Sequence, residues 1–151
     1  MRIFRVETLI KRSPETVFQL LADLAGYAAW LPPSPVYKET TDISEQPIQV
    51  GTTYLDKRQT YEMRGEVTKY KPYTRLAFHQ SSFINQPGAR GELDMHVRYM
   101  LTPKEEGTRV LRTCEIRTED LLAIFQPFVV EPIRKESERI VQRMKWYLEA
   151  R

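Results

Sequence analysis

The sequence has almost no cysteine and no long apolar run. Cys114 is the single cysteine among 151 residues, so an internal disulfide is excluded. A lone thiol fits a reducing compartment, and the N-terminal run has no secretory pattern. No run of about 18 apolar residues occurs, which predicts no integral membrane association. We therefore expect a cytoplasmic protein.

Histidine and glycine are scarce as well. Each of the two histidines, His79 and His96, lies on the charged side of an alternating segment, which predicts a solvated surface position. With one cysteine and two such histidines, the sequence predicts no zinc or iron site. The six glycines never form a GxG pair, which excludes a dinucleotide fingerprint or a phosphate-cradling loop. No metal or cofactor is therefore predicted, and no residue is assigned a catalytic role.

Charge of one sign is not concentrated anywhere in the chain. The 23 basic and 20 acidic residues are interleaved, and the formal net charge is only +3. A protein that binds nucleic acid usually carries a basic stripe or cluster, and none is visible here. The sequence therefore predicts no nucleic-acid partner.

What is present is a strand-rich chain with a helical end. The length favours a single domain over residues 1–151. Residues 3–10 alternate as a strand does, and residues 36–118 form a run of segments with the same period of two. In the clearest of them, Leu93 to Leu101 are apolar at every second position while polar or charged residues lie between, with Met100 as the exception, which is typical of an antiparallel sheet with one wet face.

The helical signals flank this run. Ser13 and Pro14 predict a cap and first turn, Gly26 is expected to break that helix, and a second short helix should end near Trp30. The last ~30 residues show helical spacing, with interruptions expected at Pro127 and Pro132. A sheet with one apolar face needs a cover, and only this long helix is large enough. The sequence thus predicts an α+β helix-grip fold, in which a curved antiparallel sheet wraps around a long C-terminal helix.

Several segments resemble a known family in the right order. They are "SPETVFQLLADLAGYAAWLPP", "VGTTY", "GEVTKYKPYTRLAF" and the terminal "RMKWYLEA". The chain resembles the START-like, Bet v 1-like superfamily, in the branch of polyketide cyclases/dehydrases and lipid transport proteins. The resemblance implies an elongated hydrophobic cavity between sheet and helix. Oxygenase members use two histidines and a carboxylate for iron, and the sequence shows no such motif, so that activity is not carried over.

Arg112 is the most informative polar residue. It alternates with Val110, Cys114 and Ile116, which places it on the buried side of its strand. A buried arginine needs a partner, so Arg112 is a candidate anchor for a carboxylate, carbonyl or phenolate group of a ligand. The alternatives are a structural ion pair with Asp56 or Glu66, or an error in the assigned face.

A second group shares one side of the strand "YLDKRQT". If Tyr54 faces inward, Asp56 and Arg58 must follow it, either as a structural ion pair or as chemical groups of the site. The predicted wall of the cavity also contains aromatic and methionine side chains, which an ordinary core uses equally well. These candidates are Trp30, Phe78, Met95, Tyr99 and Phe125.

The leading hypothesis is a non-catalytic binding protein for a small hydrophobic molecule such as a lipid, an isoprenoid quinone or an aromatic polyketide. An alternative is a cyclase/dehydratase that uses polar residues in the same cavity. A third is a quinone chaperone or partner-binding module. In each case we expect a monomer or a homodimer.

Overall fold

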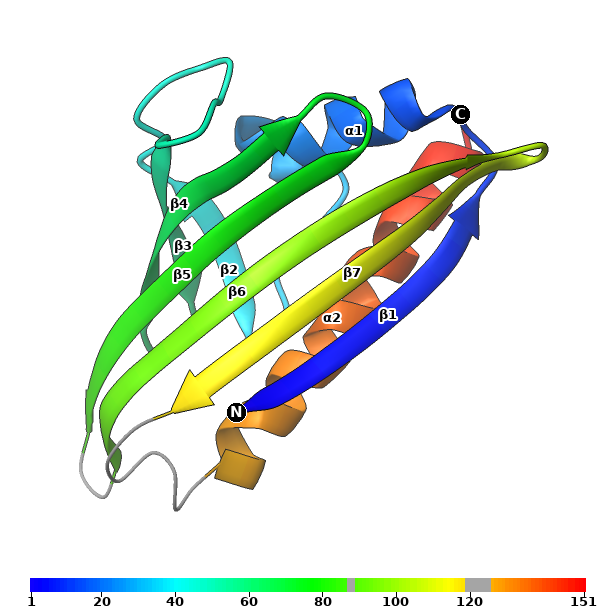
Figure 1. Ribbon diagram of the computed structural model, residues 1–151. Coiled ribbons are helices and arrows are strands. Elements are labelled where there is room, and N and C mark those ends of the chain that lie inside the picture. Colours follow the sequence, from blue (N-terminus) through cyan, green and yellow to red (C-terminus); the bar gives the residue numbers. More distant parts are fainter. Residues whose placement is uncertain (87–88, 119–125) are drawn as a thin grey trace.

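The computed structural model describes residues 1–86, 89–118 and 126–151. These residues form one seven-stranded antiparallel sheet that curves around a long C-terminal helix (Figure 1). The sheet order is β1-β7-β6-β5-β4-β3-β2. The strands are β1 (Arg2–Ile10), β2 (Tyr37–Thr41), β3 (Thr53–Arg58), β4 (Glu62–Lys71), β5 (Arg75–Gln86), β6 (Ala89–Lys104) and β7 (Gly107–Thr118). The predicted helix-grip fold is confirmed.

The alternation seen in the sequence explains which face of the sheet is buried. Leu93, Met95, Val97, Tyr99 and Leu101 of β6 are all buried, whereas the charged residues between them face outward. β5 and β6 are longer than the sequence suggested, because their pairing continues to Gln86 opposite Ala89. The concave face is therefore apolar along most of its length, and the convex face is polar.

Two short helices, α1 (Pro14–Ala22) and the 3₁₀ helix η1 (Leu24–Ala29), connect β1 to β2. The predicted cap is present, since the Ser13 hydroxyl accepts a hydrogen bond from the Thr16 amide at 3.2 Å. The predicted break at Gly26 is wrong, because the chain leaves α1 at Asp23 and Gly26 lies inside η1. The Asp23 side chain folds against Gly26, where a Cβ atom would lie 2.2 Å from Oδ2.

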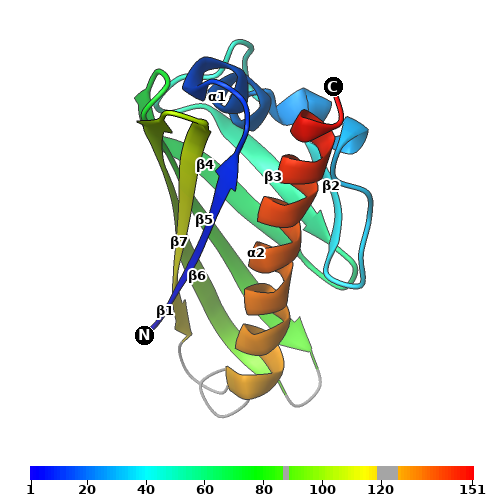
Figure 2. The same ribbon diagram turned by 90° about the vertical axis from the view of Figure 1, so that its right-hand side faces the viewer.

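The helix α2 (Gln126–Glu149) crosses the concave side of the sheet (Figure 2). The expected interruptions at Pro127 and Pro132 do not occur. Pro127 is the second helical residue, where the amide has no intrahelical partner, and Pro132 removes only one bond of the ladder. The end of α2 is attached to the end of β1, because Arg12 donates to the Leu148 carbonyl at 2.8 Å. None of the helices in the described ranges is long and apolar enough to cross a membrane.

The β6–β7 hairpin depends on a glycine, which gives a first testable prediction. Gly107 has a φ of +151°, and a Cβ atom there would lie 2.1 Å from the Ile10 carbonyl oxygen on β1. We expect Gly107→Ala to lower the free energy of unfolding by about 1–3 kcal/mol through this overlap, beyond the backbone strain. Urea denaturation of both proteins measures the difference.

Gly51→Ala is the matched control, because Gly51 has a φ of +95° and nothing within 4 Å of its added Cβ. We expect Gly51→Ala to lower the free energy of unfolding by roughly 1 kcal/mol, through backbone strain alone. Equal losses in the two variants would show that the close approach of β1 to the hairpin does not constrain position 107.

Candidate functional site

A cavity of about 60 Å³ lies between the sheet and α2, and η1 contributes Leu24 and Tyr27 to its lining. Its lining comes from β2, β3, β5, β6 and β7 on the sheet side and from α2 on the other side. A cavity of this size holds a few water molecules and is well below the roughly 300–1,000 Å³ of typical ligand pockets. A larger ligand would therefore have to displace some of the side chains that line it.

One part of the lining is apolar. Phe78 of β5 and Met95 and Tyr99 of β6 form the sheet side, and Ile133 faces them from α2. The Phe78 ring meets the rings of Tyr54 and Tyr99 edge-on, with centroid distances of 5.8 and 6.5 Å. Edge-to-face packing of this kind leaves the rings well ordered and gives the cavity a rigid apolar wall.

Arg112 enters the cavity from β7 and is only 8% exposed. Its Nε donates to the Ser137 hydroxyl on α2 at 3.2 Å, and its Nη1 donates to the Tyr99 hydroxyl on β6. Burial alone would lower the pKa of Arg112, but attraction to Tyr99 and Cys114 outweighs it and the pKa is raised. The guanidinium therefore remains charged inside the protein.

The partners of Arg112 are hydroxyl groups, which excludes two of the three interpretations made from the sequence and leaves its role as a ligand anchor a prediction. The assigned face is right, since Arg112 is buried. The suggested ion pair with Asp56 or Glu66 is not found, because Glu66 is exposed on the other face of the sheet. Among the described residues no carboxylate lies within 4.0 Å of this guanidinium, so its charge has no ionic partner.

Asp56 and Arg58 form a buried ion pair on β3, with 3.3 Å between Oδ2 and Nη2. Burial raises the pKa of Asp56, and the nearby Arg58 only partly reverses this. Asp56 Oδ1 and Arg58 Nε are both buried and have no hydrogen-bond partner within the described part of the chain. Both residues line the cavity, so these two atoms are available to a polar group bound there.

Tyr54 lies beside this pair and is held in place by two neighbours. Its hydroxyl accepts a hydrogen bond from Gln80 Nε2 at 2.7 Å, and burial raises its pKa, which keeps the phenol neutral. Gly65 stands directly opposite on β4, where a Cβ atom would lie 2.1 Å from the ring. Glycine at this position therefore lets the Tyr54 ring lie flat against β4.

The sequence analysis missed three polar residues of the lining, namely Thr40, Gln80 and Glu136. Gln80 follows Phe78 by two positions on β5, so strand alternation could have placed it inside. Glu136 lies on α2 and is only 7% exposed. Its carboxylate accepts from Arg139 and from the Ser34 hydroxyl, which allows it to be buried at the edge of the apolar stripe.

One predicted site residue, Trp30, is not in the lining. Trp30 is buried, but it packs against Tyr27 at a centroid distance of 5.1 Å, and it is Tyr27 and Leu24 that reach the cavity. Phe125 falls outside the described residues. The remaining candidates all line the cavity, and their role in binding stays a prediction; they are Tyr54, Arg58, Phe78, Met95, Tyr99 and Arg112.

Comparison with solved structures places this fold among known ones. An uncharacterised protein from Rhizobium leguminosarum is similar at a TM-score of 0.74 and 13% identity, over 99% of this chain and 95% of the other. The di-domain ARO/CYC BexL from the BE-7585A biosynthetic pathway is similar at a TM-score of 0.71 and 16% identity, over 99% of this chain and 50% of BexL. The Aha1 dimer from Colwellia psychrerythraea is similar at a TM-score of 0.66 and 21% identity, over 99% of this chain and 97% of the other.

These identities are low, so the structural matches establish the fold alone. No curated protein matches the chain. The family described as polyketide cyclase / dehydrase and lipid transport matches residues 1–149, which is nearly the whole sequence. This chain therefore belongs to the polyketide cyclase / dehydrase and lipid transport family.

Proposed function

We propose that the cavity binds a small, mainly hydrophobic molecule that carries an anionic or carbonyl oxygen at one end. The observation that supports this most directly is Arg112, a buried cation whose partners are two hydroxyl groups rather than a carboxylate. A guanidinium in such a position can form charge-assisted hydrogen bonds to a ligand oxygen and so orient the molecule.

The apolar wall supplies the affinity in this proposal. Removing apolar ligand surface from water contributes roughly 25 cal/mol per Å², before the entropic cost of association. Because the cavity is about 60 Å³, a ligand of ten or more heavy atoms requires neighbouring side chains to move. Tyr27 on η1 and Ile140 on α2 are only partly buried and border the cavity, so they are the side chains that we expect to move.

A second candidate function is a cyclase or dehydratase reaction in the same cavity. The observation that favours it is Asp56, a buried carboxyl whose pKa is raised and whose Oδ1 has no partner among the described residues. A carboxyl group whose pKa is raised takes up a proton from a substrate more readily than an ordinary aspartate does. The fold is shared with BexL, which is described as an ARO/CYC di-domain, and this likeness is compatible with either function.

Substitution of Arg112 tests the binding proposal with two fluorescent probes. 1-Anilinonaphthalene-8-sulfonate and N-phenyl-1-naphthylamine share an aromatic body, and only the first carries an anionic group. We expect Arg112→Met to weaken binding of the sulfonate by about 10–100-fold, because a charge-assisted hydrogen bond is lost, and to change binding of the neutral amine little. Fluorescence titration of each probe gives the two dissociation constants.

Arg109→Met is the matched control, since Arg109 lies on the same strand but is exposed and paired with Glu7. It should leave both dissociation constants unchanged. The binding proposal is wrong if neither probe binds the unsubstituted protein, and the role of Arg112 is wrong if its variant weakens both probes equally.

The pH dependence of stability tests the proton-holding role of Asp56. Because its pKa is raised in the folded state, the folded protein holds this proton more tightly than the unfolded chain does. The resulting stabilisation is fully present below the unfolded pKa of about 3.9 and is lost as the pH rises through the folded pKa. Each unit of increase in the pKa corresponds to about 1.4 kcal/mol of this loss.

We therefore expect the Asp56→Asn variant to lose less stability than the unsubstituted protein as the pH rises above 4, measured by urea unfolding at each pH. Asp42→Asn, which changes an exposed carboxyl, serves as the control for the loss of one negative charge. Parallel pH profiles for the Asp56 variant and the unsubstituted protein would remove the basis for acid–base catalysis by Asp56.

A further inference from the structure

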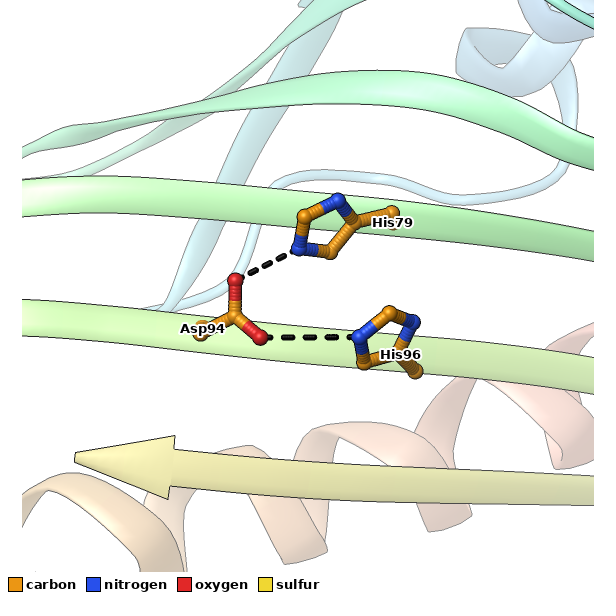
Figure 3. A group of neighbouring side chains, drawn as sticks. All are labelled: His79, Asp94 and His96. Carbon is orange, nitrogen blue, oxygen red and sulfur yellow. Dashed lines mark hydrogen bonds and ion pairs between the residues drawn. The ribbon is translucent and has the colours of Figure 1, made fainter.

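A second group of chemically active side chains lies on the convex face of the sheet, opposite the cavity. His79 on β5 and His96 on β6 are direct cross-strand partners, and Asp94 precedes His96 by two residues. All three side chains therefore point to the same outer face (Figure 3). The sequence analysis treated the two histidines as separate surface residues, and it could not see that the register brings them together.

The three side chains converge on one another. Asp94 Oδ1 lies 2.5 Å from His79 Nε2, and Asp94 Oδ2 lies 3.5 Å from His96 Nε2. The two imidazole rings are stacked, with 4.4 Å between their centroids and 7° between their planes. One ligand atom from each of the three residues falls within 4.8 Å of the others. The side chains are 35%, 37% and 27% exposed for His79, His96 and Asp94, so the group is reachable from solvent.

We propose that His79, Asp94 and His96 bind one late first-row divalent cation, such as Zn²⁺, on the convex face of the sheet. Two imidazole nitrogens and one carboxylate oxygen form a ligand set that suits zinc, nickel or copper better than magnesium or calcium, which prefer oxygen ligands alone. Metal–nitrogen bonds are about 2.0–2.1 Å long and lie in the plane of the imidazole. The two rings would therefore have to rotate out of their parallel stack to direct both Nε2 atoms at one ion.

The surrounding face carries charges of both signs. Glu66 of β4 lies opposite His79, and Glu115 of β7 lies opposite His96. Arg98 binds Glu115 at 3.1 Å, and Arg117 lies opposite Asp94 and 3.9 Å from Glu115. Arg64 lies opposite Ser81, whose other cross-strand neighbour is Asp94. Glu115 thus pairs with two of these arginines, and Asp94 pairs with the two histidines.

Two imidazole rings that are stacked in this way repel each other when both are protonated. Burial, and then repulsion from His79, lowers the pKa of His96. The simplest competing account is a hydrogen-bonded His–Asp–His group that stabilises the β5–β6 pair without metal. The two accounts predict different effects of added Zn²⁺ on the side-chain nitrogen resonances of the two histidines.

The chain contains only two histidines, and both belong to this group, so histidine signals report on the site without background. The full-length protein, purified without a histidine tag and treated with EDTA, is titrated with ZnCl₂ at pH 7.5. We expect one equivalent to shift the side-chain nitrogen resonances of both histidines in NMR spectra, and calorimetry to give one site. Bound zinc should also raise the melting temperature by a few degrees.

His96→Gln and Asp94→Asn should each weaken zinc binding by at least about tenfold, because each removes one ligand while keeping a polar side chain of similar size. Glu92→Gln is the matched control, since Glu92 is an exposed carboxylate on the same face of β6, two residues before Asp94. It should bind zinc as the unsubstituted protein does.

Two results would overturn the proposal. One is the absence of any histidine shift in the unsubstituted protein at several equivalents of zinc, which requires no variant to fold. The other is equal zinc affinity in the unsubstituted protein and the His96 variant. Neither measurement involves the cavity, so the metal site and the proposed binding of a hydrophobic ligand can fail independently.

Discussion

A curved sheet with one apolar face has to be covered by a single helix, and α2 provides that cover (Figure 2). Lys145 donates to the Leu9 carbonyl at 2.5 Å and Arg12 to the Leu148 carbonyl at 2.8 Å, which attaches α2 to β1. The helix consequently packs mainly along the β1 side of the sheet. The strands farther from β1 extend past it, and the cavity forms where their concave face is not pressed against the helix.

This geometry also explains why charged residues are tolerated in the interior. Arg112 joins β7 to α2 and β6 through hydroxyl groups, and Asp56 pairs with Arg58 along β3. Burying such groups is a weak source of stability compared with apolar packing. Their concentration around one cavity, with some atoms still without partners in the described chain, is the pattern expected of a site that meets a polar group.

The same strand serves both faces of the sheet. β6 directs Met95 and Tyr99 into the cavity and Asp94 and His96 outward, because successive side chains of a strand alternate. The two surfaces are therefore separated by the thickness of one sheet and differ in chemistry, with an apolar wall inside and imidazole and carboxylate groups outside.

The sequence by itself determined the order of the elements, and with the need to cover one apolar sheet face it predicted the helix-grip fold. Strand alternation assigned Arg112 to the buried face and required Arg58 to share the side of Tyr54, but it left open which side that was. Only the tertiary structure decided which side chains of different elements contact one another. Arg112 bonds to hydroxyls from other elements, and His79 meets His96 through strand register. Periodicity fixes the direction of a side chain relative to its own element, whereas contacts between elements depend on how the whole sheet pairs and curves.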